Sequence, residues 1–258
     1  MEVYRCEELD TKRQWPRLDA AWLLLRLPFP VPGLSLADDY TPEAIAVSTQ
    51  TDRDVILVLD RSGSMNEFSS DPAAWTAAGP GEAFHGSRWR ELVSAVDVFL
   101  QVLDDSPLAE QVGLATFSNW TNEDQMMSSD YTGIQASMDG YTQAFTGGYT
   151  EIGEGIYVGI DLLIDPARAR PFASKTLIVM TDGIENTGRD NLAAAKLAHD
   201  TCGITVHTIT FSAGALQQPM KDAAAAGGGG EHNHAADAAQ LRAIFIDLPR
   251  NLPTLLTK

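Results

Sequence analysis

The sequence is short of cysteine and of basic residues, and each shortage excludes a class of protein. Only two of the 258 residues are cysteines, Cys6 and Cys202, and they lie far apart, so they form no zinc or redox motif. Lys and Arg number 18 against 35 Asp and Glu, which gives a formal net charge of −17. This charge repels nucleic acid and anionic lipid at long range, so we expect no nucleic-acid partner.

Long apolar segments are missing as well. The apolar run Ala20–Leu27 is too short to span a membrane and is followed closely by prolines. Residues 1–5 lack the basic start and apolar core of a signal peptide. The sequence therefore predicts no transmembrane segment in this chain.

The two cysteines leave two alternatives open. In an oxidising compartment, a disulfide between Cys6 and Cys202 would tie the N-terminal segment to the core. Cys202 beside Gly203, at the end of a predicted helix, is equally typical of a buried free thiol.

Residues 1–50 differ in character from the rest of the chain because five prolines interrupt them: Pro16, Pro28, Pro30, Pro32 and Pro42. We predict an N-terminal extension over residues 1–50, which is either the tail of an upstream region or an extended segment packed on the main domain. Residues 51–258 are long enough and apolar enough for one large core, and we predict a single domain there.

The most informative segment is residues 55–65, Val-Ile-Leu-Val-Leu-Asp-Arg-Ser-Gly-Ser-Met. Its first five residues are continuously apolar, which is typical of a central parallel strand covered by helices on both faces. Asp60, Ser62 and Ser64 follow at alternate positions. In open α/β sheets, ligands bind at the carboxyl ends of strands, and a carboxylate with two hydroxyls offers the hard oxygen ligands that Mg²⁺ or Mn²⁺ prefers.

The sequence Asp60-x-Ser62-x-Ser64 resembles the metal-ion-dependent adhesion site of von Willebrand factor type A domains. The resemblance implies two further ligands, a Thr in a Gly-rich loop before a helix and an Asp at the end of a later strand. Thr150, after Gly147-Gly148-Tyr149, has the first place, and Asp182, after the apolar segment 176–181, has the second. Each motif alone has a simpler explanation as a turn or a helix cap. Their joint occurrence in three segments, each after the expected local structure, favours the metal site.

The rest of the domain alternates between strand and helix patterns, which predicts a doubly wound α/β fold. We expect a mostly parallel central sheet flanked by helices, with one short antiparallel edge strand within residues 119–131. Strands are predicted over 55–60, 111–118, 177–181 and 204–211 and near His232, and helices after Ser87, over 134–141, after Thr150, over 191–201 and over 237–248.

Two other kinds of site are less well supported. His232 and His234 would face the same side of a strand, but no third metal ligand is evident in the sequence. The haloacid-dehalogenase type of phosphatase needs a second Asp two residues after the first, and Ser62 occupies that place here. No Gly-x-Ser-x-Gly segment of a serine hydrolase is present either, so we predict a protein that is not an enzyme.

Within the von Willebrand factor type A family, three segments are similar to the domains at the C-terminal end of bacterial Tad-type (tight adherence) pilus-assembly proteins: 57–65, 203–211 and 236–245. This likeness implies a cell-envelope or extracellular protein that binds a partner through Mg²⁺, with Mn²⁺ or Ca²⁺ as alternatives, in pilus assembly or adhesion. Those proteins usually carry an upstream membrane helix, which this sequence lacks.

The resemblance implies that an acidic side chain of a protein partner completes the coordination of the ion. Five residues near the predicted ligands are candidates for partner contacts: Phe68, Trp75, Phe84, Tyr149 and Glu185. The alternative function is an intracellular, chelatase-like subunit that works with an AAA-type ATPase, which would place the protein in the cytoplasm. A third alternative is a structural domain that binds no metal.

Overall fold

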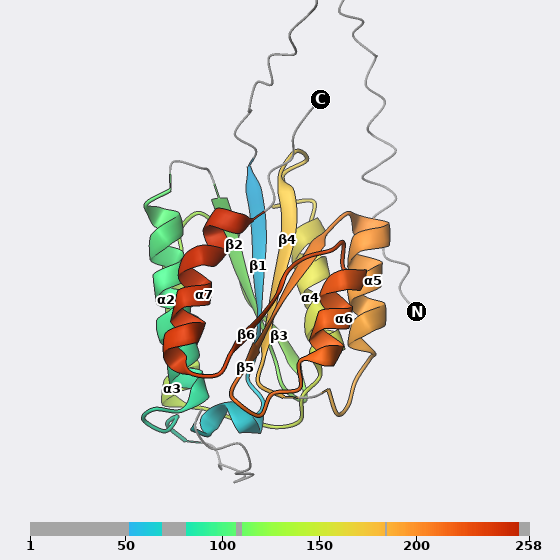
Figure 1. Ribbon diagram of the computed structural model, residues 1–258. Helices are drawn as coiled ribbons and strands as arrows, with labels where there is room; N and C mark the ends of the chain where they lie inside the picture. The colour runs from blue at the N-terminus through green and yellow to red at the C-terminus, as the bar shows by residue number, and fades with distance from the viewer. Residues whose placement is uncertain (1–51, 69–80, 107–109, 184, 253–258) are drawn as a thin grey trace, which may run out of the picture. The chain divides into compact units, whose positions relative to one another are not determined.

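A six-stranded sheet forms the centre of the structure, a computed structural model that describes residues 52–68, 81–106, 110–183 and 185–252 (Figure 1). The strand order is β3-β2-β1-β4-β5-β6. Among these strands, β3 alone runs antiparallel to its neighbour. The strands are β1 (Arg53–Asp60), β2 (Glu110–Phe117), β3 (Thr121–Ser128), β4 (Ser174–Thr181), β5 (Thr205–Phe211) and β6 (His232–Ala235).

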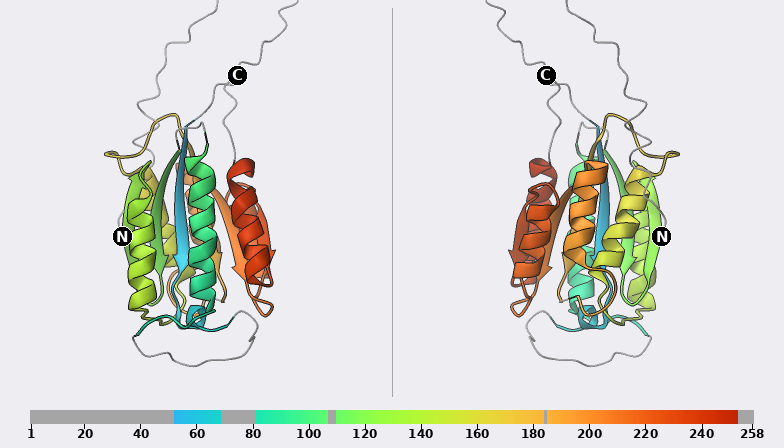
Figure 2. Two further views of the ribbon diagram at one scale, coloured as in Figure 1. Left: turned by 90° about the vertical axis from the view of Figure 1, so that its left-hand side faces the viewer. Right: turned by 90° about the vertical axis from the view of Figure 1, so that its right-hand side faces the viewer.

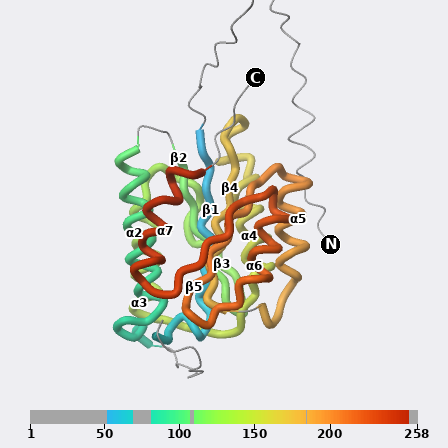
Figure 3. The backbone as a smooth tube through the Cα atoms, viewed as in Figure 1, coloured from blue at the N-terminus to red at the C-terminus, as the bar shows by residue number. Residues whose placement is uncertain are grey.

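Helices cover both faces of the sheet (Figure 2). One face carries α2 (Arg88–Asp104), α3 (Thr132–Gln143) and α7 (Ala238–Asn251). The other carries α4 (Ile152–Ile164), α5 (Asn191–Cys202) and α6 (Gln218–Ala226). Figure 3 shows the same arrangement as a backbone trace, with the strands between the two layers of helices. The predicted doubly wound α/β fold is confirmed, and β3 is the antiparallel edge strand expected within residues 119–131.

The position of β1 at the centre of the sheet explains its uninterrupted apolar sequence. Alternate side chains of a strand point to opposite faces. Val55, Leu57 and Leu59 belong to the core shared with α2 and α7, whereas Ile56 and Val58 face α4. Because both faces are covered by helices, a polar residue at any of these positions would be buried without water.

Glycines in α4 bring this helix close to the sheet. A Cβ atom at Gly155 would lie 2.6 Å from Cδ1 of Phe117, and one at Gly159 would lie 2.7 Å from Cδ2 of Leu177. Real side chains do not approach so closely, so α4 can pack at its observed distance because these positions lack a side chain. The helix that follows Thr150 is thereby held directly over β1.

Capping residues set the starts of several helices. The Ser87 hydroxyl accepts a hydrogen bond from the Arg90 backbone N–H, and Asp190 and Asp237 cap α5 and α7 in the same way. Gly203 ends α5 in the left-handed conformation, with a φ of 65°. These local signals place the helix ends that the sequence predicted.

The strand register brings the ends of β1 and β4 to the same edge. Leu59 pairs with Met180, so Asp60 and Thr181 end neighbouring parallel strands side by side. This carboxyl edge is at the lower end of the sheet in Figure 1, where the short 3-10 helix η3 (Gly63–Asn66) follows β1. The loops that leave β1 and β4 therefore start next to each other.

Some sequence predictions fall outside the residues that the structure describes. These are the N-terminal extension over residues 1–50, Trp75 and Cys6. Cys202 is not a free thiol in the structure, so the free-thiol alternative is not the one adopted. Within the described part of the chain, no helix combines the length and the apolar character needed to cross a membrane.

Candidate metal centre

The five predicted ligands come from three loops that meet at the carboxyl edge of the sheet. Asp60, Ser62 and Ser64 lie between β1 and η3, Thr150 precedes α4, and Asp182 directly follows β4. Ser64 is half-buried, and the other four are buried. The site thus encloses oxygen atoms from distant segments of the chain. Asp60 and its hydrogen-bond partner Thr181, for example, are 121 positions apart.

Hydrogen bonds link the first loop to the end of β4. The hydroxyls of Ser62 and Ser64 lie 3.1 Å apart, and the Ser64 hydroxyl donates to Oδ1 of Asp182 at 2.8 Å. The Thr181 hydroxyl donates to Oδ2 of Asp60 at 2.6 Å, and the Ser62 backbone N–H donates to Oδ1 of Asp60 at 2.7 Å. Both carboxylates are therefore oriented by neighbours within the chain.

Thr150 is held beside Asp182 by pairing with Asn186, a residue that the sequence analysis did not identify. The Thr150 backbone N–H donates to Oδ1 of Asn186 at 3.0 Å, and the Asn186 backbone N–H donates to the Thr150 carbonyl at 3.1 Å. This pair of bonds fixes the Gly-rich loop against the loop that follows β4.

The glycines before Thr150 permit this loop to touch the one after β1. The Gly63 backbone N–H donates to the Gly148 carbonyl at 3.0 Å. A Cβ atom at Gly147 would lie 2.4 Å from the Gly63 Cα, which leaves no room for a side chain. The Gly-rich composition of the loop is thus explained by close backbone contact.

The two buried carboxylates affect each other's ionisation. The pKa of Asp60 is raised to about 7, first because burial disfavours the charged form and second because the Asp182 carboxylate is close. Burial also raises the pKa of Asp182, although the Arg88 guanidinium beside it acts in the opposite direction. An added cation at this place would relieve the repulsion between the two carboxylates.

The ligand set fits a divalent cation that prefers oxygen ligands better than a metal that prefers nitrogen or sulfur ligands. No cluster of three or more His, Cys, Asp or Glu side chains that could hold a metal occurs among the described residues. The site consists instead of two carboxylates and three hydroxyls, and oxygen ligands of this kind suit Mg²⁺, Mn²⁺ or Ca²⁺.

Gly183 keeps space open between the hydroxyl groups. A Cβ atom there would lie 3.6 Å from Oγ1 of Thr150 and 3.9 Å from Oγ of Ser64, at ordinary contact distances from both. A side chain at this position would occupy the space between two predicted ligands. The residues present therefore fit a bound ion in their chemistry, and Gly183 adds no side chain between them.

Two arginines near the site were not identified from the sequence. Arg88, the first residue of α2, places Nη1 2.5 Å from Oδ2 of Asp182. Arg61, between Asp60 and Ser62, turns the other way and donates to the carbonyl and hydroxyl oxygens of Thr146, with its guanidinium over the Tyr141 ring. Position in the sequence alone gave no signal for either contact.

Aromatic side chains are exposed in the loops at this edge. The exposed fractions of the predicted contact residues Phe68, Phe84 and Tyr149 are 50%, 47% and 58%. Trp120, in the turn between β2 and β3, is also exposed and was not predicted. Asn119 beside it packs on Gly148, next to Tyr149, so the two exposed aromatic residues lie on contacting loops.

Glu185, a predicted partner contact, is held by hydrogen bonds within the chain. Its two carboxylate oxygens accept hydrogen bonds from the backbone N–H groups of Gly153 and Asn191, at 2.7 and 2.9 Å. It therefore caps the starts of α4 and α5 at once, and its carboxylate is engaged inside the chain. Burial raises the pKa of Glu185, and these two hydrogen bonds oppose that effect.

The His232 and His234 side chains lie along β5 and contact threonines. Nδ1 of His232 is 2.9 Å from the Thr208 hydroxyl, and Nδ1 of His234 is 3.0 Å from the Thr210 hydroxyl. Hydrogen bonds to the neighbouring strand β5 thus position both imidazole rings, and the sequence pattern showed no third metal ligand beside them.

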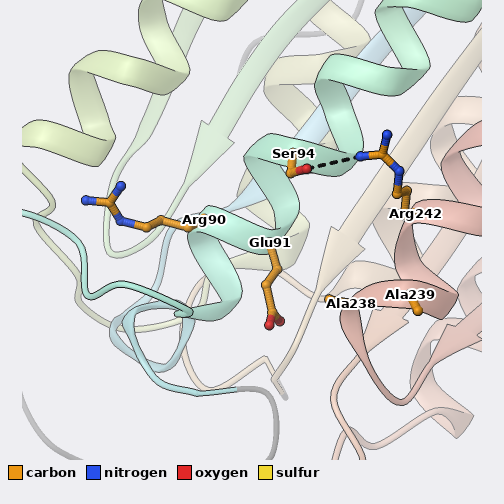
Figure 4. Close-up of a pocket in the computed structure, with 6 residues that line it drawn as sticks. All are labelled: Arg90, Glu91, Ser94, Ala238, Ala239 and Arg242. Atoms are coloured by element: carbon orange, nitrogen blue, oxygen red, sulfur yellow. Dashed lines mark hydrogen bonds between the residues drawn. The ribbon is translucent and has the colours of Figure 1, made fainter.

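A hollow of about 330 Å³ lies between α2 and α7, apart from the predicted ligands (Figure 4). In Figure 4, Arg90 points away from α7, whereas Arg242 reaches toward α2 and donates to the Ser94 hydroxyl at 3.2 Å. None of the residues that line the hollow is a predicted metal ligand; they are Arg90, Glu91, Ser94, Ala238, Ala239 and Arg242.

Comparison with known protein families decides the classification. The family model for the von Willebrand factor type A domain matches residues 54–245, which is most of the chain. The chain belongs to this family. VWA domains are typically protein-interaction modules, are usually not catalytic and often bind a divalent metal. A search of curated proteins finds no match.

Solved structures share the fold of this VWA domain at low sequence identity. A D319A mutant of the PilB minor pilin from Streptococcus sanguinis is 16% identical, with a TM-score of 0.64 over 80% of this chain and 62% of that one. BatB from Bacteroides thetaiotaomicron, a conserved hypothetical protein, is 18% identical, with a TM-score of 0.55 over 77% of this chain and 98% of that one. The chain thus spans about three fifths of the pilin, and these likenesses show the fold alone.

Proposed function

We propose that this VWA domain binds a protein partner through a divalent metal ion, Mg²⁺ first and Mn²⁺ or Ca²⁺ as alternatives, held at the carboxyl edge of the sheet. The observation that carries the proposal is the meeting of five predicted ligand residues from three loops, among them two buried carboxylates, one of which is paired with an arginine. The five ligand residues are Asp60, Ser62, Ser64, Thr150 and Asp182.

The chain's own residues would prepare the site before the ion binds. Thr181 and the Ser62 backbone orient Asp60, while Asn186 holds the Thr150 segment beside Asp182. A bound Mg²⁺ would supply positive charge and an open coordination position, which an acidic side chain of the partner would fill. The exposed aromatic residues Phe68, Phe84, Trp120 and Tyr149 would then contact apolar groups around that acid.

The family and the fold support a role in adhesion or assembly. The similarity to Tad-type proteins and the shared fold with a minor pilin favour a pilus or surface role in the cell envelope or outside the cell. A chelatase-like subunit in the cytoplasm would use the same site with a different partner. Oxidation of Cys202 in the protein isolated from cells would support the envelope.

Metal removal tests the proposal directly. We expect the melting temperature of the chain to be about 5 °C or more higher in Mg²⁺ or Mn²⁺ than in EDTA, when the ion concentration exceeds the dissociation constant about a hundredfold. Asp182→Ala removes one buried ligand and should abolish this shift. Differential scanning fluorimetry measures both proteins across the same titration, and an equal shift in both would contradict the proposed site.

Gly183→Ala supplies a sharper variant because it changes no ligand. The added methyl group would occupy the space between Thr150 and Ser64 at ordinary contact distances, so the melting temperature in EDTA should stay close to that of the native chain. The shift with Mg²⁺ should fall markedly. A full Mg²⁺ shift in this variant would place the ion elsewhere.

A further inference from the structure

Arg88 is a buried cation that touches two of the predicted metal ligands. Its side chain is 6% exposed, and Nη1 lies 2.5 Å from Oδ2 of Asp182 and 3.4 Å from the carbonyl oxygen of Ser64. Its backbone N–H donates to the Glu67 carbonyl at 2.7 Å, so the start of α2 is fixed beside the site. A guanidinium is always protonated in proteins, and this positive charge is therefore permanent.

A permanent cation in this place opposes the binding of a metal ion. A dication bound by Asp60, Asp182 and the three hydroxyls would lie within a few ångströms of the Arg88 guanidinium, since Asp182 is shared between the two. Like charges at such distances repel strongly in a site removed from water. The affinity of the site for the ion is thus lower than its two carboxylates alone would give.

The same charge favours an external anion once the ion is bound. Asp60 and Asp182 carry two negative charges, Arg88 carries one positive charge, and a divalent ion adds two, which leaves the loaded site with a net charge of about +1. Without Arg88 the loaded site would be neutral. Arg61 is present in both cases, so its charge does not alter this comparison; its guanidinium lies over the Tyr141 ring and bonds to Thr146.

We propose that Arg88 determines specificity at this site by lowering affinity for the metal and raising the affinity of the metal-loaded site for a carboxylate of the partner. The inference rests on the proposed function, since it concerns the same ion. In this proposal, Arg88 favours an anion over water at the coordination position that the five predicted ligands leave open. The partner chemistry that follows is an ionised Asp or Glu side chain rather than a neutral oxygen ligand.

The test replaces Arg88 by Gln and measures two affinities that should move in opposite directions. The Kd for Mn²⁺, measured by electron paramagnetic resonance of the free ion, should fall about tenfold in R88Q. Acetate serves as the probe for the partner carboxylate. Its displacement of water from bound Mn²⁺, measured by water proton relaxation, should require about tenfold more acetate in R88Q than in the native chain.

Two control variants separate charge from shape. Arg88→Lys keeps the positive charge and should restore both affinities to within about threefold of the native values. Arg90→Gln removes an arginine two positions further along α2, whose guanidinium bonds to the Ala83 carbonyl and to Glu82 instead, and it should change neither affinity.

Each outcome decides between the role of Arg88 and the proposed function. If the native chain binds Mn²⁺ but R88Q has the same two affinities, or loses both together, the inference is overturned and the proposed function stands. If the native chain binds no Mn²⁺, both are overturned. R88Q is purified in excess Mg²⁺, which should supply the missing positive charge, and failure to fold under that condition also overturns the inference.

Discussion

Buried acidic side chains occur at both ends of β1, but the two ends differ in how cations match them. At the amino end, Asp54 accepts hydrogen bonds from Nε and the backbone N–H of Arg170, at 2.8 and 3.0 Å, and Arg53 lies 3.3 Å from Glu110. At the carboxyl end, Asp60 accepts hydrogen bonds from Thr181 and Ser62, which carry no charge, and Arg88 contacts Asp182.

The difference distinguishes a structural charge cluster from a candidate ligand site. At the amino end, two arginines face two buried carboxylates, so the buried charges balance within the chain; Arg170 also lies 3.3 Å from the exposed carboxylate of Asp52. Burial raises the pKa of Glu110, but Arg53 and Arg170 oppose this effect. At the carboxyl end, Asp182 adds to the rise in the pKa of Asp60, and Arg88 contacts Asp182, whereas the hydrogen bonds to Asp60 come from uncharged groups. The two carboxylates and Arg88 together keep a negative charge there, which attracts a further cation.

Asp54→Ala should give the largest effect on stability. It leaves the Arg170 guanidinium without its buried partner, and breaking a buried ion pair from one side costs about 3–5 kcal/mol. Urea unfolding followed by circular dichroism measures the loss, which should be the same in EDTA and in Mg²⁺. A loss that Mg²⁺ reverses would show that the two ends of β1 are coupled.

Asp60→Asn should have the opposite effect in the absence of metal and stabilise the chain. The amide removes the repulsion with Asp182 and keeps an oxygen that can accept from the Ser62 backbone N–H, so the free energy of unfolding in EDTA should rise by about 1 kcal/mol. The stabilisation by Mg²⁺ should disappear. Urea unfolding with and without Mg²⁺ measures both, and Asp54→Asn is the matched control, expected to lower stability in both conditions.

Glu154→Gln should have the smallest effect, although Glu154 also lies near the carboxyl edge. Its partner Arg189 is half exposed, and exposed ion pairs contribute about 0–1 kcal/mol because water and salt screen them. The free energy of unfolding should change by no more than about 0.5 kcal/mol, and the Mg²⁺ shift should be unchanged. A lost Mg²⁺ shift in this variant would extend the site beyond the five predicted ligands.

Much of the fold could be predicted because local patterns and burial agree. The apolar run 55–59 indicated a strand covered on both faces, and the recurrence of Trp89, Leu92, Val96 and Phe99 indicated a helix that buries one side. Ser87, Asp237 and Gly203 mark helix ends through short-range hydrogen bonds or backbone conformation. These features depend on residues within a few positions of each other.

Contacts between distant segments could not be predicted in the same way. Arg88 and Asp182 are 94 positions apart, and Glu185, predicted as a candidate partner contact, accepts hydrogen bonds at the starts of two helices. Asn186 likewise reads as an ordinary turn residue. Their roles depend on which loops the sheet register brings together, and that register is a property of the whole core.

Local sequence patterns predicted most of the strand and helix order of this protein, but not α6, and also the oxygen-bearing residues at the ends of β1 and β4, because apolar periodicity and turn chemistry act locally. The distribution of charge around those oxygens depends on the tertiary structure. The fold pairs two arginines with two acids at one end of β1 and leaves two acids with one arginine at the other, since charge balance depends on distances in space rather than on spacing along the chain.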